Sequence, residues 1–269
     1  MLLAIDIGNT NITLGVFDGQ RLRSTWRLAT DSRRLPDEYG LLVSSILPLK
    51  GINAEDITGA CLCSGVPTLT STFEEVCKSY FKVSPLTVSA GVKTGVHILY
   101  DSPRDVGADR IVDAVAAFQL YGGPVIIVDF GTATVFDAVS RDGEYLGGAI
   151  APGINVAAEA LFLSTSMLRR VELTPPKSAI GRNTVAALQS GLLLGQVGLV
   201  EGMVRRFKDE MGQDARVVAT GGLAAVIARE TETFDAINPD LTLIGLRIVH
   251  EMNMGPPSTS QATSQGEGG

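Results

Sequence analysis

The strongest constraint on this chain is a strand-and-turn pattern that occurs twice. Near the start, the apolar run Leu2–Ile5 leads into Asp6-Ile7-Gly8-Asn9-Thr10. A second strand is predicted over Asn11–Phe17, and Asp18-Gly19 after it is a typical hairpin turn. This segment therefore predicts a strand, an Asp-x-Gly turn, a second strand and a tight turn into a third.

The second copy begins near the middle of the chain. The apolar run Val125–Val128 leads into Asp129-Phe130-Gly131-Thr132, a strand is predicted over Ala133–Val139, and Asp142-Gly143 supplies the hairpin turn. The two aspartates are 123 positions apart (129 minus 6), close to half of the 269 residues. Chance easily matches Asp-x-Gly alone, but it rarely matches the flanking strands and both turns. The repeat predicts two similar halves, 1–121 and 122–255, with a cleft between them.

The rest of the chain alternates between predicted strands and helices, which is typical of an α/β fold. Further strands are predicted at Arg21–Leu28, Ile57–Cys63 and Val217–Ala219. Helices are predicted at Pro36–Leu47, Thr68–Tyr80, Gly107–Leu120, Arg182–Arg206 and Leu241–Met252, with another opened by Gly221-Gly222. Residues 256–269 are rich in Ser, Gln, Gly and Pro, and we expect this tail to be disordered.

Composition excludes several classes of protein. The net charge is −7, whereas a nucleic-acid-binding protein needs a basic face, so we expect no nucleic-acid partner. No run of 18 apolar residues is present, and Gln196 and Glu201 interrupt the longest helical segment, so we expect no membrane span. Asp6 interrupts the first apolar run, and no basic region precedes that run, which favours a buried strand over a signal peptide.

The three cysteines are few and odd in number, which favours reduced thiols in a cytoplasmic protein. Cys61 and Cys63 stand two apart in a predicted strand, so their side chains share a face. No third and fourth ligand stands at a suitable spacing. We therefore expect buried thiols and no cysteine metal site.

A stripe of glycines runs along the predicted helix Arg182–Arg206. Gly191, Gly195, Gly198 and Gly202 are spaced by four, three and four residues, which places them on one face. Each helical glycine costs about 1 kcal/mol relative to alanine. Close approach of a second helix would offset that cost, and a helix from a second copy of the chain is the expected partner. An indifferent glycine-rich surface is the alternative.

The two Asp-x-Gly turns are candidates for binding a polyphosphate and its metal. Glycine lets backbone N–H groups approach an anion, and an aspartate beside it can hold a cation directly or through water. Short polar side chains follow the first aspartate: Asn9, Thr10, Asn11 and Thr13. Either turn alone could simply end a strand, but two facing turns would hold a polyphosphate from both sides. No Gly-Lys-Ser loop of the Walker type is present.

The sequence Gly-Ala-Asp-Arg, residues 107–110, falls in the first turn of a predicted helix. Asp109 could merely complement the helix dipole there. Alternatively it is a general base, because a kinase must deprotonate or orient an acceptor hydroxyl for in-line attack on the γ-phosphoryl group. Arg110 beside it could pair with an anionic acceptor. A further glycine element, VVATGGLA, could present backbone to a base or ribose, although alone it is a weak signal.

Taken together, these segments resemble the type III pantothenate kinases of the acetate and sugar kinase/Hsc70/actin superfamily. The matching pieces are DIGNTNI, YDSPRDVGADRIVDAV, VDFGTAT, GGAIAPG, GRNTVAALQSG and VVATGGLA, which occur in the family's order up to about Asn253. The resemblance implies a duplicated actin-like, ribonuclease H-like fold of two mixed-sheet halves. It also implies ATP-dependent phosphorylation of pantothenate, the first step of coenzyme A synthesis, by a cytoplasmic homodimer that requires K⁺ or NH₄⁺ and a divalent metal, expected to be Mg²⁺.

The resemblance also implies roles for individual residues. Asp109 matches the proton acceptor, Asp129 the ligand of the monovalent cation, and Thr132 an ATP-binding position. The ATP phosphate loop comprises Asp6, Ile7, Gly8, Asn9, Thr10, Asn11, Ile12 and Thr13. The pantothenate-binding positions are Tyr100, Gly107, Ala108, Asp109, Arg110 and Thr184.

Three other functions use the same scaffold. A non-catalytic regulator would be favoured by loss of Asp6, Asp109 or Asp129, and all three are present. Another small-molecule kinase, for sugars or acetate, usually has a longer chain with inserted subdomains. A nucleotide switch like actin or Hsc70 also needs insertions for which 269 residues leave little room.

Overall fold

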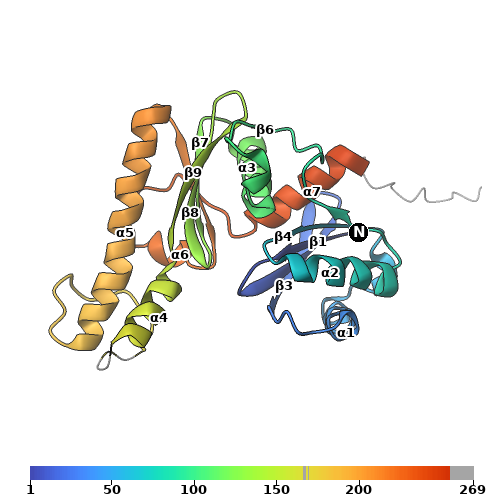
Figure 1. Ribbon diagram of the computed structural model, residues 1–269, viewed down its shortest axis with the longest axis horizontal. Coiled ribbons are helices and arrows are strands. Elements are labelled where there is room, and N and C mark those ends of the chain that lie inside the picture. The colour runs from blue at the N-terminus through green and yellow to red at the C-terminus, as the bar shows by residue number, and fades with distance from the viewer. Residues whose placement is uncertain (166–167, 169, 255–269) are drawn as a thin grey trace, which may run out of the picture.

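The computed structural model describes residues 1–165, 168 and 170–254, which form two lobes built on two mixed β-sheets (Figure 1). The first sheet has the strand order β3-β2-β1-β4-β5 and the second has the order β11-β10-β7-β8-β9-β6. The strands of the first sheet are β1 (Leu2–Ile7), β2 (Asn11–Asp18), β3 (Arg21–Ala29), β4 (Gly59–Ser64) and β5 (Leu86–Thr87). Those of the second are β6 (His97–Ile98), β7 (Val125–Phe130), β8 (Ala133–Val139), β9 (Glu144–Pro152), β10 (Arg216–Gly221) and β11 (Ala236–Ile237).

The two sheets have the same plan, so the predicted duplication is confirmed. In the first, β1 pairs antiparallel with β2 and parallel with β4. In the second, β7 pairs antiparallel with β8 and parallel with β10. The central strands run two residues beyond the predicted ends, because the ladders continue through the pairs Ile7↔Ile12 and Phe130↔Thr134. Asp6 and Asp129 therefore lie one residue inside their strands.

Helices cover both sheets and join them. They are α1 (Pro36–Ile46), α2 (Pro67–Tyr80), α3 (Ala108–Tyr121), α4 (Ile154–Ser164), α5 (Thr184–Met211), α6 (Ala224–Ile227) and α7 (Leu241–Met254). Single 3₁₀ turns occur at Pro48–Lys50, Ala54–Asp56 and Pro103–Asp105. One apolar cluster packs α1 and α2 against the first sheet, and another packs α5 against the second. The third cluster contains residues from both sheets and from α3 and α7 (Figure 1).

The predicted halves exchange elements in the folded chain. Strand β6, from the first half, pairs with β9 in the second sheet. Helix α7, from the second half, packs on β1 and β4 in the first sheet and against α3. The halves 1–121 and 122–255 therefore remain a prediction about the sequence and do not coincide with the two lobes. The predicted disordered tail, 256–269, lies outside the described residues.

Five elements have no counterpart among the individually predicted segments. Strands β5, β6 and β11 have two residues each, which is too short for a periodic pattern. Strand β9 was expected only as the unbounded third strand of the repeat. Helix α4 is apolar around most of its circumference, and Ile154 is its one buried residue, so no amphipathic stripe marks it.

The predicted helix Arg182–Arg206 appears as α5, which begins two residues later and extends to Met211. Within the described residues, α5 is long and apolar enough to cross a membrane by length and composition alone. Core helices of globular proteins pass the same test, and α5 packs Leu193, Val197 and Val200 against the second sheet. This packing explains its apolar side without a membrane.

Candidate active site

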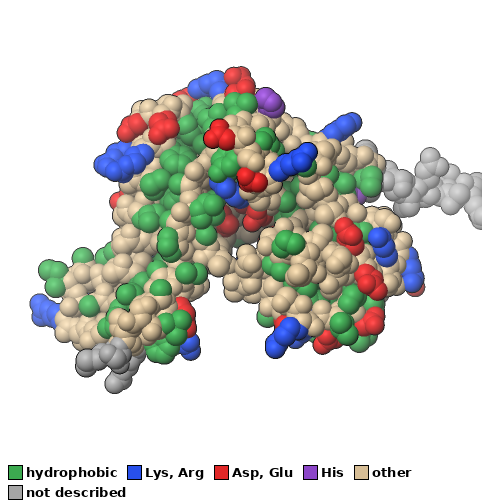
Figure 2. All heavy atoms as spheres, viewed as in Figure 1, with side chains coloured by type: hydrophobic (Ala, Val, Ile, Leu, Met, Phe, Trp, Pro, Cys, Tyr) green, Lys and Arg blue, Asp and Glu red, His purple; other side chains and the backbone are tan. Residues whose placement is uncertain are grey.

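The two Asp-x-Gly turns meet in the folded chain. The first is closed by a hydrogen bond from Gly8 N to Asn11 O of 3.0 Å, and the second by one from Gly131 N to Ala133 O of 3.0 Å. The hydroxyls of Thr10 and Thr132, one from each turn, lie 2.9 Å apart. Figure 2 shows acidic side chains at the hollow between the two lobes. The two turns therefore face each other at this hollow, as predicted.

Asp6 lies at the base of the first turn with one hydrogen-bond donor. Cys63 stands directly beside it in the β1–β4 ladder, and the thiol donates to Asp6 Oδ1 at 3.5 Å. Burial raises the pKa of Asp6 to about 7; the negative charge of Asp109 adds to the rise, and the thiol hydrogen bond opposes it. Burial raises the pKa of Cys63 well above its usual range, so the thiol stays a donor.

The phosphate-loop residues predicted around Asp6 divide into two groups. Ile7 and Ile12 are fully buried in the core, so only their backbone can reach a nucleotide. The polar members face outward: Asn9, Thr10 and Asn11 are exposed. A Cβ at Gly8 would lie 3.0 Å from Asn11 O, so glycine keeps this turn tight.

Asp129 occupies the equivalent place in the second turn. Burial raises its pKa to about 7, and the negative charges of Asp6 and Asp109 contribute to the rise. Its neighbour in the parallel ladder is Thr220 on β10. A Cβ at Gly221, whose φ is +86°, would collide with Asp129 Oδ1. The first glycine of VVATGGLA therefore makes room for this carboxylate, a role that differs from the predicted contact with a base or ribose.

Asp109 comes from α3, a different element from either turn. It is the second residue of α3, after the N-cap Gly107 and Ala108, and so lies in the first turn of the helix as predicted. Its Oδ1 accepts a hydrogen bond of 2.9 Å from the backbone N–H of Arg110. Because its charge raises the pKa of both Asp6 and Asp129, the Asp109 carboxylate lies within electrostatic range of both turns.

Arg110 points away from the turns and into a buried network. Its Nε and Nη2 donate to Asp137 Oδ1 on β8 at 3.0 and 2.6 Å, and the hydroxyl of Tyr145 on β9 donates to the same oxygen at 2.6 Å. Tyr100, a predicted pantothenate-binding residue, lies beside Tyr145 with a distance of 6.3 Å between ring centroids. The structure thus brings Tyr100 and Arg110 to one wall, with Gly107 and Ala108 at the start of the same helix.

Several residues of this region were missed from sequence. Asp137 and Tyr145 hold Arg110, and Cys63 holds Asp6. Asp113 lies one turn after Asp109 on α3, is buried, and has one carboxylate oxygen without a hydrogen-bond partner among the described residues. The available signal was weak, because each of these residues stands in an apolar run that reads as core.

Thr184 lies apart from the other predicted substrate residues. It is exposed at the first position of α5, at the end of that helix farthest from α3 (Figure 1). The glycine stripe of the same helix faces open space, because a Cβ at Gly191, Gly195 or Gly198 would meet no atom within 4 Å. The expected close helix partner is therefore absent from the described part of this chain.

Carboxylates predominate where the two turns meet, whereas Arg110 is already paired with Asp137 on β8. No group of three or more His, Cys, Asp or Glu residues in the described ranges is arranged to hold a metal. Asp129 accepts no hydrogen bond from the described residues, so its carboxylate oxygens remain available as ligands for a cation whose other ligands come from substrate or water.

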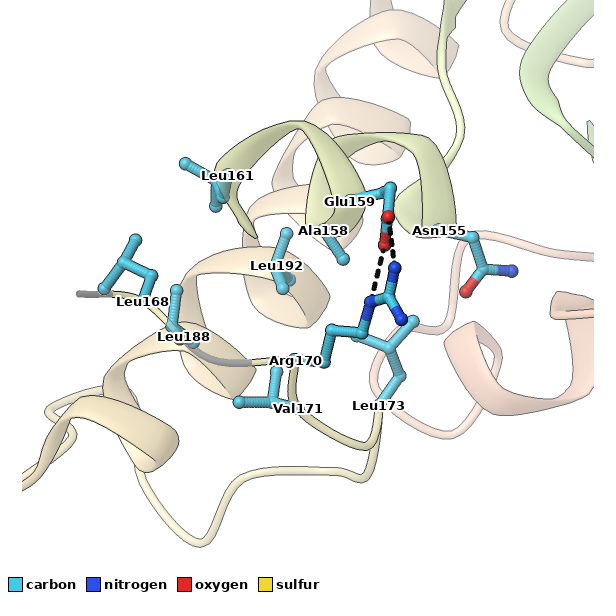
Figure 3. Close-up of a pocket in the computed structure, with 10 residues that line it drawn as sticks. All are labelled: Asn155, Ala158, Glu159, Leu161, Leu168, Arg170, Val171, Leu173, Leu188 and Leu192. Carbon is cyan, nitrogen blue, oxygen red and sulfur yellow. Dashed lines mark hydrogen bonds and ion pairs between the residues drawn. The ribbon is translucent and has the colours of Figure 1, made fainter. Parts of the chain in front are cut away.

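A separate pocket of ≈ 220 Å³ lies between α4, α5 and the segment before α5 (Figure 3). It is lined mainly by leucines, and Arg170 forms an ion pair of 2.6 Å with Glu159 at its side. None of the predicted catalytic or substrate-binding residues lines this pocket. The pocket is therefore separate from the acidic site where the two turns meet.

Comparison with known proteins gives consistent results. A family model described as type III pantothenate kinase matches residues 2–206. The type III pantothenate kinase of Dehalococcoides mccartyi (strain ATCC BAA-2266 / KCTC 15142 / 195) is 53% identical over 252 residues, covering 94% of this chain and 98% of that protein.

Two solved structures share the fold at low sequence identity. A Campylobacter jejuni protein named "conserved putative Baf family transcriptional activator" has a TM-score of 0.59 and 19% identity, covering 93% of this chain and 98% of its own. A Sinorhizobium meliloti protein named "putative 2-dehydro-3-deoxygalactonokinase" has a TM-score of 0.56 and 12% identity, covering 97% and 99%. At these identities the likeness concerns the fold alone, and the predicted duplicated fold of the sugar-kinase type is confirmed.

Proposed function

The chain belongs to the type III pantothenate kinase family, and from this premise we propose which of its residues carry out the phosphorylation of pantothenate. It is a kinase that acts in coenzyme A biosynthesis, with ATP as the phosphoryl donor. The observation that carries the proposal is the contact between the two turns through Thr10 and Thr132, with Asp109 at the start of α3 near enough for its charge to act on the carboxylates of both.

Asp109 is the general base in this proposal. Phosphoryl transfer needs an acceptor hydroxyl held in line with the γ-phosphoryl group, and a carboxylate suits that task. Its place at the start of a helix puts the carboxylate near the positive end of the helix dipole, and the hydrogen bond from Arg110 N fixes one oxygen. The other oxygen remains for the hydroxyl of pantothenate, whose proton it accepts.

The first turn binds the phosphates of ATP. The backbone from Asp6 to Thr13 and the exposed polar side chains of Asn9, Thr10 and Asn11 are close to the second turn, where Thr132 supplies a further hydroxyl. Asp6 interacts with Mg²⁺ bound to the phosphates. Few protein ligands suffice for this metal, because Mg²⁺ keeps several waters and takes ligands from substrate phosphates.

Asp129 binds the monovalent cation, K⁺ or NH₄⁺. A buried carboxylate without a donor is costly unless a cation compensates it. Two further carboxylates nearby increase the negative potential that an ATP tetraanion would meet, so a cation here lowers the repulsion between enzyme and nucleotide. When bound, the ion supplies positive charge next to the phosphates.

Tyr100 and the segment Gly107 to Arg110 bind pantothenate. In this arrangement Arg110 faces the substrate carboxylate and Asp109 faces the hydroxyl. The position of Thr184 supports a homodimer, because this residue reaches a pantothenate site only if the site lies on a second copy. We place the enzyme in the cytoplasm, where its substrates and its reduced cysteines are both expected.

The dimer contact is assigned to the open face of α5. A Cβ at Gly191, Gly195 or Gly198 would meet no atom of the described residues within 4 Å. Apolar side chains around the start of α5 and on α4 are exposed: Val156, Leu161, Leu163, Ile180 and Val185. Replacement of Gly195 and Gly198 by leucine is expected to split the dimer and to abolish pantothenate binding. Sedimentation measures the oligomeric state, and a kinase assay measures the activity. Gly143→Ala is unsuitable as a control, because the φ of +80° at Gly143 would strain an alanine. Leu49→Ala, which changes an exposed side chain on the other lobe, is the matched control. A fully active dimer after the double substitution would contradict the assignment.

A coupled assay tests the proposal as a whole. Purified chain is incubated with ATP, Mg²⁺ and pantothenate in K⁺, NH₄⁺, Na⁺ or Li⁺ buffer, and ADP release and 4′-phosphopantothenate are both measured. Turnover is expected in K⁺ and NH₄⁺ and is expected to collapse in Na⁺ and Li⁺. Equal rates in all four salts would remove the cation from the proposal while leaving the kinase activity in place.

A further inference from the structure

The network around Arg110 carries an inference beyond the binding positions already assigned. We propose that Asp137 and Tyr145 are positioning residues that turn the Arg110 guanidinium so that its Nη1 edge is presented to the carboxylate of pantothenate. This inference rests on the proposed role of Arg110 in binding that carboxylate.

Some N–H groups of Arg110 donate to protein atoms, and the others face solvent. Nε and Nη2, along one side of the guanidinium, both donate to Asp137 Oδ1. Nη1 has no partner among the described residues, and it is not one of their buried unsatisfied atoms, so it keeps contact with solvent. The Nη1 and Nη2 hydrogens that remain form the end-on edge, which matches the two oxygens of a carboxylate.

Asp137 and Tyr145 leave the guanidinium little freedom. The side chain of Asp137 is 3% exposed and that of Arg110 is 12% exposed, so both are held by packing. The guanidinium carbon lies 5.8 Å from the centroid of the Tyr145 ring, whose hydroxyl shares the Asp137 oxygen. A buried ion pair of this kind is weak evidence for stability but fixes geometry well.

Two glycines of β9 leave the space in which this arrangement forms. A Cβ at Gly148 would lie 2.8 Å from both Arg110 Nη2 and Asp137 Oδ1. A Cβ at Gly147 would contact the Tyr100 ring at 3.4 Å. The side chains of Arg110 and Tyr100 therefore lie against the backbone of β9. Asp137 determines the direction in which the guanidinium points.

The inference predicts an effect on recognition of the carboxylate and no effect on phosphoryl transfer. The test compares pantothenate with panthenol, its alcohol counterpart, in which CH₂OH replaces the carboxylate. Asp137→Asn is expected to raise the KM for pantothenate about 10- to 100-fold, as expected when hydrogen bonds to a charged group are weakened. The kcat, the KM for ATP and the kcat/KM for panthenol are expected to stay near wild type.

Tyr145→Phe removes one hydroxyl and keeps the ring, so it remains informative if Asp137→Asn does not fold. Its expected rise in the KM for pantothenate is about three- to tenfold, because one hydrogen bond to Asp137 is lost. Asp214→Asn is the matched control, since it removes an exposed ion pair with Arg141 and is expected to change none of these constants.

Three results would overturn the inference. Equal losses for pantothenate and panthenol would indicate a merely structural role. A lower KM for pantothenate in Asp137→Asn would mean that Asp137 only screens the charge of Arg110. Unchanged constants in both variants would remove any role in binding. Arg110→Gln separates the premise from the inference: if it keeps the preference for pantothenate over panthenol, the assignment of Arg110 itself fails.

Discussion

The two Asp-x-Gly turns have the same framework and different surroundings. In each lobe an aspartate stands on the central strand, one residue before its end, between an antiparallel and a parallel neighbour. Asp6 receives a hydrogen bond from Cys63, whereas Asp129 receives none from the described residues and lies against the backbone of Gly221. The repeated backbone therefore supplies two equivalent carboxylate positions, and the neighbouring strand decides what each carboxylate can bind.

The difference suggests a division of work. A carboxylate that already accepts a hydrogen bond is held in one orientation, which suits a fixed partner such as phosphate-bound Mg²⁺. A carboxylate without a donor must be compensated by an ion that enters with the substrate. The following predictions test this comparison, beginning with the largest expected effect.

Asp109→Asn tests whether the two turns can support the reaction without the Asp109 carboxylate as base. The amide keeps the shape of the side chain and cannot accept the hydroxyl proton, so we expect kcat to fall by about 10²- to 10⁴-fold. Affinity for ATP and the melting temperature are expected to stay close to wild type. They are measured by nucleotide titration and by thermal unfolding. Activity within threefold of wild type would show that the two turns suffice.

Asp129→Asn and Asp6→Asn test the division of work directly. With Asp129→Asn we expect the rates in K⁺ and Na⁺ to become equal within about twofold, because the ligand of the ion is lost. With Asp6→Asn we expect lower rates in every salt and a preserved preference for K⁺. Steady-state rates at fixed ionic strength measure both ratios. Loss of the preference in both variants would show that the two turns share one cation.

The pH dependence of stability provides the third test. The pKa of Asp6 and of Asp129 is raised to about 7 in the folded chain, from an ordinary value of 3.8. The folded state thus binds protons more tightly than the unfolded state, and the resulting stability is present below about pH 4 and lost as pH rises through about 7.

We therefore expect the free energy of unfolding of the ligand-free enzyme to fall between about pH 4 and pH 7. Asp129→Asn removes part of this dependence and is expected to raise the free energy of unfolding at about pH 8 by roughly 1–4 kcal/mol. Denaturant unfolding at several pH values measures it, with the exposed Asp142→Asn as control. A stability profile that Asp129→Asn leaves unchanged would show that its carboxylate is already compensated.

The smallest expected effect concerns Cys63. Cys63→Ala removes the donor to Asp6, so we expect the acidic limb of the pH–rate profile to move upward by about 0.3 to 1 pH unit. Cys63→Ser keeps a donor and is expected to restore the wild-type limb. Cys61→Ala, on the same face of the same strand, is the matched control. A shift with Cys61→Ala as large as with Cys63→Ala would attribute the effect to packing.

Local signals explain which parts of the fold could be predicted from the sequence. The strands β1, β2, β7 and β8 are apolar runs punctuated by Asp-Gly turns, and both are local features. Asp109 could be proposed because a helix start carries its own signature. The two-residue strands, and α4 without an amphipathic stripe, have no comparable signal.

The partners of the candidate site residues could not be predicted from the sequence, because they depend on tertiary register. Asp137 and Arg110 are 27 positions apart and meet only because α3 packs against β8. Cys63 reaches Asp6 through the parallel pairing of β1 with β4. The sequence pattern around Arg110 predicts a substrate contact but gives no sign that Nε and Nη2 already donate to Asp137.

The exchange of β6 and α7 between the lobes has a consequence for how this enzyme could be divided. A cut between residues 121 and 122 separates the duplicated halves of the sequence. Each fragment then lacks an element that packs on it in the intact fold and that the other fragment carries. The first fragment lacks the helix that covers β1 and β4, and the second lacks the strand that pairs with β9 and the helix that packs against α7. Neither fragment therefore contains a complete lobe, and the two together are suited to a fragment-complementation experiment. Co-expression of the two pieces would link their reassembly to the recovery of coenzyme A synthesis in a cell that lacks its own pantothenate kinase.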